Sequence, residues 1–112
     1  MAVMSSETLH ATSVSVAGRG VLIEGASGAG KSDLALRLID RGAQLVSDDY
    51  SYIQRRGGRI IAGPPATIAG KIEVRGIGIV VMPHVGEAPV ALIVALGEPA
   101  ARLPEPGYAR TL

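Results

Sequence analysis

Residues 21–32 read Val-Leu-Ile-Glu-Gly-Ala-Ser-Gly-Ala-Gly-Lys-Ser, and this stretch decides the fold class. It opens with three apolar residues, which is typical of a short strand buried on both faces. The segment that follows matches the pattern G-x-x-x-x-G-K-[ST], whose glycines let successive backbone N–H groups point into one concavity. The stretch therefore predicts a strand, a phosphate-binding loop and a helix, in that order.

The polar residues of this loop pattern have separate physical tasks. Lys31 reaches the β- and γ-phosphates of a nucleotide, and the hydroxyl of Ser32 can ligate magnesium. We therefore predict a site for ATP with Mg²⁺ rather than a glycine turn without function. The predicted nucleotide-binding residues are Gly25, Ala26, Ser27, Gly28, Ala29, Gly30, Lys31 and Ser32.

The residues after the loop change to helical periodicity. Charged side chains recur on one stripe of residues 31–41, and leucine, isoleucine and alanine fill the opposite side. Gly42 lies where a helix C-cap favours positive φ. Residues 44–47 predict a second buried strand, so strand, helix and strand form a βαβ unit whose strands are expected to pair in parallel.

The remaining apolar runs predict further strands. Residues 13–24 are expected to form a hairpin with its turn at Gly18-Arg19-Gly20. A second hairpin is expected around Gly57-Gly58, between residues 50–55 and 59–62. Other predicted strands lie at residues 71–74, at residues 78–81 and, as a buried strand, at residues 90–96. The sequence thus predicts one α/β domain over residues 1–112, rich in strand, with one main helix after the phosphate loop.

Composition excludes several classes of protein. The net charge of +1 gives no electrostatic reason to expect nucleic acid or an anionic membrane as a partner. The absence of cysteine excludes disulfides and thiolate metal sites. Residues 1–10 lack the pattern of a signal peptide, and no apolar stretch approaches about 20 residues, the length of a membrane span. We therefore expect a cytoplasmic protein.

An acidic pair, Asp48-Asp49, follows the second buried strand directly. Because the carboxyl ends of parallel strands meet at one edge of a sheet, these carboxylates are expected near the phosphate loop, where a metal ligand or a general base is needed. The alternative is that one aspartate caps a turn before Tyr50.

Taken together, these features resemble the catalytic C-terminal domain of HPr kinase/phosphorylase in its short form. The resemblance rests on His10, the phosphate loop, residues 45–49 (Leu-Val-Ser-Asp-Asp) and the run Ile-Glu-Val-Arg-Gly-Ile-Gly-Ile at residues 72–79, with a weaker match at Arg102-Leu103. It implies a P-loop NTPase core of the PEP-carboxykinase-like type. It also implies an ATP-dependent kinase for a serine of the phosphocarrier protein HPr, with the reverse reaction, in regulation of the phosphotransferase system and carbohydrate metabolism.

The same resemblance implies roles for individual residues. Asp49 would accept the hydroxyl proton, with Asp48 supporting it or ordering the metal. Glu73 would join Ser32 as a ligand of magnesium. Lys31 would offset charge on the phosphate oxygens.

Two further catalytic residues come from the resemblance. His10 would orient or tune the acidic pair, and its alternative is an ordinary surface histidine. Arg102 would contact phosphate, and its alternative is a solvated tail residue. Arg75 would either assist or form a salt bridge beside a turn, and His84 has no role that the resemblance assigns.

The chain stops soon after Arg102, so we expect a domain truncated at its C-terminus. That leaves open the phosphorylase activity, a homo-oligomer and the competence of the short chain. Two other functions stay open: a P-loop kinase for a small molecule, and a nucleotide-binding module without turnover.

Overall fold

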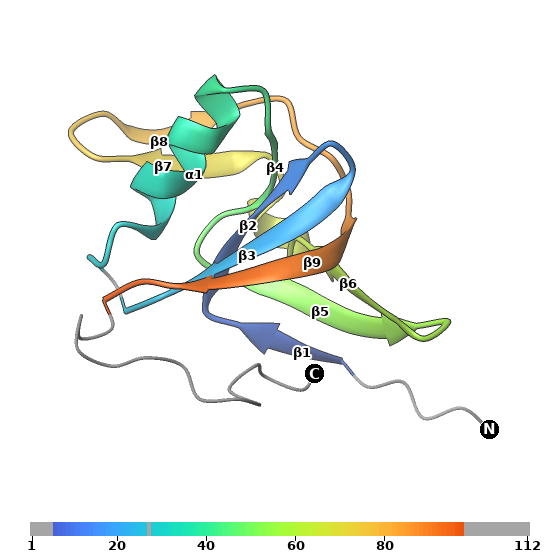
Figure 1. Cartoon of the computed structure of the whole chain (residues 1–112). Helices are drawn as coiled ribbons and strands as arrows, with labels where there is room; N and C mark the ends of the chain where they lie inside the picture. The colour runs from blue at the N-terminus through green and yellow to red at the C-terminus, as the bar shows by residue number, and fades with distance from the viewer. Residues whose placement is uncertain (1–5, 27, 98–112) are drawn as a thin grey trace.

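The computed structural model describes residues 6–26 and 28–97 and is rich in strand, with one main helix (Figure 1). Seven strands form a sheet in the order β1-β5-β6-β9-β3-β2-β4, and β7 and β8 form a separate hairpin. The strands are β1 (Ser6–Leu9), β2 (Ala11–Val16), β3 (Arg19–Glu24), β4 (Gln44–Ser47), β5 (Ser51–Arg56), β6 (Arg59–Gly63), β7 (Lys71–Val74), β8 (Gly78–Val81) and β9 (Ala88–Ala95). The helices are α1 (Lys31–Asp40) and a 3-10 turn, η1 (Ala66–Ile68). The predicted strand-rich α/β class is confirmed.

The predicted hairpins and helix are all present, with one shift in a turn. β2 and β3 pair in antiparallel fashion, but the turn lies at Ala17-Gly18, one residue earlier than expected, because Val16 pairs with Arg19. Both turn residues have positive φ, 51° and 82°, as a two-residue hairpin turn of the right twist requires. Gly42, with φ of 108°, follows the C-cap residue of α1 as predicted. Strand β1 and the 3-10 turn were not predicted.

The predicted parallel pairing of the strands on either side of α1 is wrong. β2 lies between β3 and β4 and is antiparallel to both, while the parallel partner of β3 is β9. The preceding hairpin strand thus takes the position that a simple βαβ unit would give to β4. Nevertheless, β3 and β4 run in the same direction, so their carboxyl ends still reach the same edge of the sheet.

Two apolar cores lie on opposite faces of β3. Ile23 faces the core beneath α1, together with Val14 and Leu45, whereas Leu22 faces a second core with Ile53. Burial on both faces explains why this strand reads as a continuous apolar run. Strand β9 is present as predicted, but it is not fully buried, since Leu92 is 55% exposed.

The β7–β8 hairpin packs by one face only. Ile72 is buried against the core under α1, and Figure 1 shows the hairpin beside that helix. Its outer face carries Ile79 and Val81, which are exposed. In the part of the chain that the structure describes, no helix is long and apolar enough to cross a membrane.

A candidate phosphate-binding cleft

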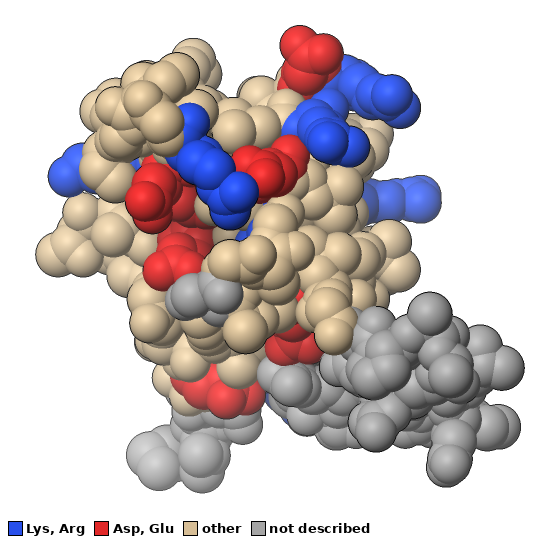
Figure 2. All heavy atoms as spheres, turned by 90° about the vertical axis from the view of Figure 1, so that its left-hand side faces the viewer, with Lys and Arg blue, Asp and Glu red and all other residues tan. Residues whose placement is uncertain are grey.

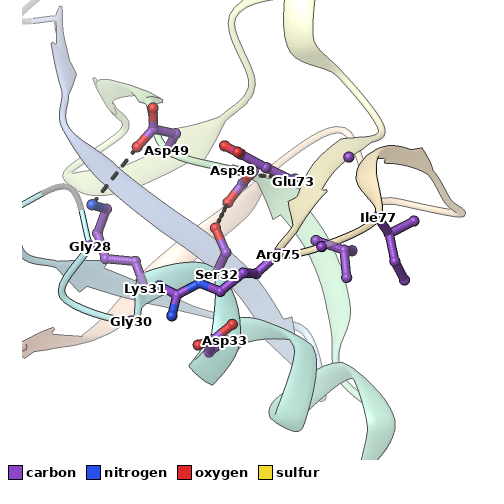
Figure 3. Close-up of a pocket in the computed structure, with 13 residues that line it drawn as sticks. Gly28, Gly30, Lys31, Ser32, Asp33, Asp48, Asp49, Glu73, Arg75 and Ile77 are labelled. Atoms are coloured by element: carbon purple, nitrogen blue, oxygen red, sulfur yellow. Dashed lines mark hydrogen bonds and ion pairs between the residues drawn. The ribbon is translucent and has the colours of Figure 1, made fainter.

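A cleft of about 640 Å³ lies between the start of α1 and the β7–β8 hairpin. Its lining comes from the glycine-rich loop before α1 (residues 25–30), the first turn of α1, the acidic pair after β4 and the hairpin (Figure 3). On the side of the molecule that carries α1 and the hairpin, acidic and basic side chains are interspersed (Figure 2). The cleft therefore offers both cations and carboxylates within a small volume.

The backbone conformation and the close packing of the loop require its glycines. Gly28 and Gly30 have φ of 87° and 100°, values that side-chain-bearing residues rarely adopt. At Gly25 a Cβ atom would lie 3.0 Å from the Cβ of Ala29 and 3.2 Å from the Leu96 carbonyl oxygen. Gly30 is the N-cap of α1 and supplies no side-chain cap, so the first N–H groups of the helix remain able to bind an anion.

Lys31 is held inside the loop. Its side chain is only 5% exposed, and Nζ donates to the carbonyl oxygens of Gly25 at 2.8 Å and Ala26 at 3.2 Å. The same ammonium lies 3.8 Å from Oδ1 of Asp49. A buried positive charge therefore lines the cleft.

Asp48 joins three segments that are distant in sequence. Its Oδ1 accepts hydrogen bonds from the hydroxyls of Ser32 at 2.6 Å and Thr12 at 3.2 Å. Its Oδ2 accepts the backbone N–H of Glu73 at 2.9 Å. Asp48 does not cap the turn with its side chain, because the N–H of Tyr50 donates to its backbone oxygen instead. This buried carboxylate ties α1, β2 and β7 together.

Asp49 is placed differently, with its side chain half exposed. Its backbone has φ of 66°, in the left-handed region, and its N–H donates to Oγ1 of Thr12 at 2.9 Å. Its Oδ1 lies 2.9 Å from Nε2 of His10, whose ring stacks on Tyr50 with centroids 5.0 Å apart. The predicted proximity of His10 to the acidic pair is therefore what the structure shows.

The opposite wall of the cleft comes from the hairpin. Glu73 and Arg75 line it, and Figure 3 shows the guanidinium of Arg75 extending over the first turn of α1. Within residues 6–26 and 28–97, Arg75 forms no ion pair, so the predicted alternative of a salt bridge beside the turn is not observed. His84 lies elsewhere, bridged to Leu45 beside β4.

Two predicted site residues, Ser27 and Arg102, lie outside the described residues. No role in the site was predicted for Asp33, which lines the cleft, or for Thr12, which contacts the acidic pair. Thr12 is fully buried and contacts both aspartates. Thr12 lies one residue before the predicted hairpin of residues 13–24. It has the same parity as Val14, so a strand begun one residue earlier would have placed both side chains on the same face.

Relatives of this chain carry the name HPr kinase/phosphorylase. The protein of that name from Clostridium tetani is 48% identical over 75 residues, which cover 67% of this chain and 25% of the relative. Its counterpart from Clostridium perfringens is 49% identical over 78 residues, or 69% of this chain and 25% of the relative. The chain thus spans about a quarter of the length of these curated relatives.

A solved structure gives the same result. The HPr(Ser) kinase/phosphatase from Coxiella burnetii superposes with a TM-score of 0.78 and 35% identity, covering 87% of this chain and 63% of that one. The family model described as the HPr serine kinase C-terminal domain matches residues 2–92. Since this match includes most of the sequence, the chain belongs to the HPr serine kinase C-terminal domain family.

Proposed function

We propose that this chain is the catalytic core of an ATP-dependent kinase for a serine of the phosphocarrier protein HPr. The observation that carries the proposal is the meeting of Lys31, Ser32, Asp48 and Asp49 in one cleft at the N-terminus of α1. The names of the relatives support HPr as the substrate. The fold would then be a P-loop NTPase core of the PEP-carboxykinase-like type, formed as one domain by residues 1–112 of a cytoplasmic protein.

Nucleotide phosphates would bind in the glycine-rich loop. The uncapped N–H groups at the start of α1 and the partial positive charge of the helix end favour an anion there. Lys31 would exchange its bonds with the loop carbonyls of Gly25 and Ala26 for bonds to phosphate oxygens, since an uncharged carbonyl oxygen is a weaker acceptor than a phosphate oxygen. Arg75 would add a second cation from the opposite wall.

The donors in the cleft fit magnesium. Ser32 and Glu73 offer oxygen atoms, the kind that Mg²⁺ prefers, and the ion usually retains several waters, so few protein ligands suffice. The described residues contain no cluster of three or more His, Cys, Asp or Glu side chains that could hold a metal alone. Bound magnesium would neutralise charge on the transferring phosphoryl group. Asp48 would keep Ser32 oriented through their 2.6 Å hydrogen bond.

Asp49 would be the proton acceptor. Its carboxylate is half exposed at the cleft and lies 3.8 Å from the ammonium of Lys31. The serine oxygen of HPr would bond to the γ-phosphorus while the bond to the β,γ-bridging oxygen breaks, ADP leaves, and the serine proton passes to Asp49. His10, at 2.9 Å, would orient the carboxylate. In the phosphorylase half of the proposal, an oxygen of inorganic phosphate would bond to the phosphorus of phosphoserine while the bond to the serine oxygen breaks, and Asp49, as the acid, would return a proton to that oxygen.

Arg102 and assembly complete the proposal. Arg102 would contact phosphate and the chain would form a homo-oligomer, as the family resemblance implies. No nucleic acid or membrane partner is proposed.

The test is transfer of label from ATP to HPr. The full chain is incubated with Mg²⁺, ATP labelled at the γ-phosphate and HPr, and HPr is assayed for phosphoserine. We expect label on HPr that is lost in Asp49→Asn and kept in Asp40→Asn, which removes an exposed carboxylate at the far end of α1. Tight ATP binding without label on HPr, also in a longer chain, would contradict the proposal and favour a nucleotide-binding module; label on a small molecule instead would favour a small-molecule kinase.

A further inference from the structure

The hydroxyl of Thr12 lies between the backbone of one aspartate and the carboxylate of the other. Thr12 is fully buried in β2, and its Oγ1 donates to Oδ1 of Asp48 at 3.2 Å. The same oxygen accepts the N–H of Asp49 at 2.9 Å. A hydroxyl has one proton to donate and lone pairs to accept with, so one group satisfies both neighbours. An apolar side chain of the same shape can do neither.

Asp49 needs such a contact more than most residues. Only Asp49 and Ala17 among the described non-glycine residues have positive φ, and Ala17 sits in a hairpin turn that requires it. An aspartate in this region is tolerated but keeps the conformation only where its surroundings fix it. The conformation places Oδ1 of Asp49 2.9 Å from Nε2 of His10 and 3.8 Å from Nζ of Lys31.

The two aspartates depend on Thr12 to different degrees. Without the hydroxyl, Asp48 still accepts hydrogen bonds from Ser32 and from the N–H of Glu73. The backbone N–H of Asp49 would lose the acceptor that the structure gives it. We propose that Thr12 is a positioning residue, which holds Asp49 in its left-handed conformation so that its carboxylate faces the cleft. This inference rests on the proposed function, in which Asp49 accepts the proton.

A neighbouring hydroxyl provides the matched control. Ser13 is also fully buried in β2, but its Oγ lies 2.8 Å from Oγ of Ser51. Because the Ser51 hydroxyl donates to the carbonyl oxygen of Ala11, Ser13 is the donor of this pair. Among the described residues neither hydroxyl of the pair hydrogen-bonds to Asp48 or Asp49, so Ser13→Ala removes a buried hydroxyl from the same strand while the hydrogen bonds of the two aspartates remain.

The first measurement is amide hydrogen exchange at Asp49 in the full chain, which needs no catalytic activity. We expect exchange at Asp49 to become at least about tenfold faster in Thr12→Val, because the amide loses its acceptor, and to stay near the wild-type rate in Thr12→Ser and Ser13→Ala. Unchanged protection of Asp49 in Thr12→Val would overturn the proposal. Should Thr12→Val fail to fold, loss of protection in Thr12→Ser, which keeps the hydroxyl, would overturn it as well.

The second measurement is the kinetics of transfer to HPr. Misplacing a catalytic group by about 1 Å lowers the rate by about 100-fold, so we expect kcat to fall by that factor in Thr12→Val with the KM for ATP changed less than about threefold. Thr12→Ser should restore most of kcat. Equal kcat in Thr12→Val and wild type, or equal losses in Thr12→Ser and Thr12→Val, would overturn the positioning role. A wild-type chain that labels no HPr would contradict the proposed function instead, and the exchange measurement would still decide whether Thr12 holds Asp49.

Discussion

The two walls of the cleft are built in opposite ways. On the wall formed by the glycine-rich loop, α1 and the end of β4, the charged groups Lys31 and Asp48 are buried, and each makes two or more hydrogen bonds. On the wall formed by the β7–β8 hairpin, Arg75 and Ile77 are exposed, and Ile77 is 76% so. One wall is fixed by polar contacts, and the other is fixed only along the inner face of a two-stranded ribbon.

This difference fits the function proposed for each wall of the cleft. Charges aimed at a transferring phosphoryl group act best when they are already in place, because no reorganisation is then needed during the reaction. The hairpin is joined to the fixed wall through the Glu73 N–H to Asp48 bond and through the buried side chain of Ile72. Asp48 is therefore the link between a preorganised wall and an exposed one.

The largest expected effect of breaking the fixed wall comes from Lys31→Met. Loss of one preorganised donor at the transferring group lowers the rate by roughly 100- to 1,000-fold, and we expect transfer to HPr to fall by that factor. Rapid-quench assays of phosphoserine on HPr measure it. Lys71→Met is the matched control, since the only other lysine of the chain lies on β7 outside the cleft lining. A rate for Lys31→Met within a few-fold of that control would show that Lys31 is not the phosphate-binding cation.

The second-largest expected effect is a difference in the free energy of unfolding between variants of the two aspartates. Asp48→Ala leaves the donors of Thr12, Ser32 and Glu73 without their acceptor, and at roughly 1.5–3 kcal/mol for a hydrogen bond to a charged group we expect a loss of about 3 kcal/mol. Asp49→Ala removes a side chain that is 51% exposed and should cost under about 1 kcal/mol. Urea unfolding at pH 7 compares them. Equal losses would mean that Asp48 does not join the two walls.

The third effect compares glycines from the two walls. Gly30 and Gly76 both have positive φ, 100° and 84°, and a Cβ would meet no atom within 4 Å at either position. Alanine should therefore cost about 1–2 kcal/mol of stability at each, from backbone strain alone. Only Gly30→Ala should also weaken ATP binding, by about tenfold, or 1.4 kcal/mol, because Gly30 aims the first N–H groups of α1. Titration calorimetry with ATP distinguishes the two variants. Equal weakening of ATP binding in both would contradict the predicted difference between the two walls.

The sequence predicts structural features that depend on neighbouring residues better than features that depend on contacts between residues far apart in the chain. The glycine-rich loop, helix 31–40 and the strand that ends just before Asp48 follow from spacing and periodicity, since each depends on neighbours in the chain. The predicted approach of the acidic pair to the loop agrees with the structure although the pairing behind it does not, because β3 and β4 share a direction whether or not they are adjacent.

What the sequence did not predict depends on contacts between distant residues. β2 lies between β3 and β4 in the sheet. A sheet with β3 and β4 adjacent would have the same apolar pattern, so the sequence does not distinguish the two strand orders. The exposure of Leu92 depends on which elements pack against β9. The hydrophobic periodicity of the sequence carries no information about that packing. Thr12 became part of the site only when register brought β2 next to the end of β4, with Ser13 opposite Ser47. Roles proposed for His10, Glu73 and Arg102 came from a family resemblance rather than from such rules.

The smallest expected effect belongs to the outer face of the hairpin. Ile79 is 66% exposed on β8, so Ile79→Ala removes few contacts and should change stability by no more than about 0.5 kcal/mol. Ile72, on the inner face of the partner strand β7, is fully buried, and Ile72→Ala should cost about 2–5 kcal/mol through lost transfer energy and a cavity. Urea unfolding of the two variants compares the faces of one hairpin. A cost for Ile79→Ala close to that of Ile72→Ala would show that the outer face is covered in solution, and the exposed wall would then be as closely packed as the fixed one.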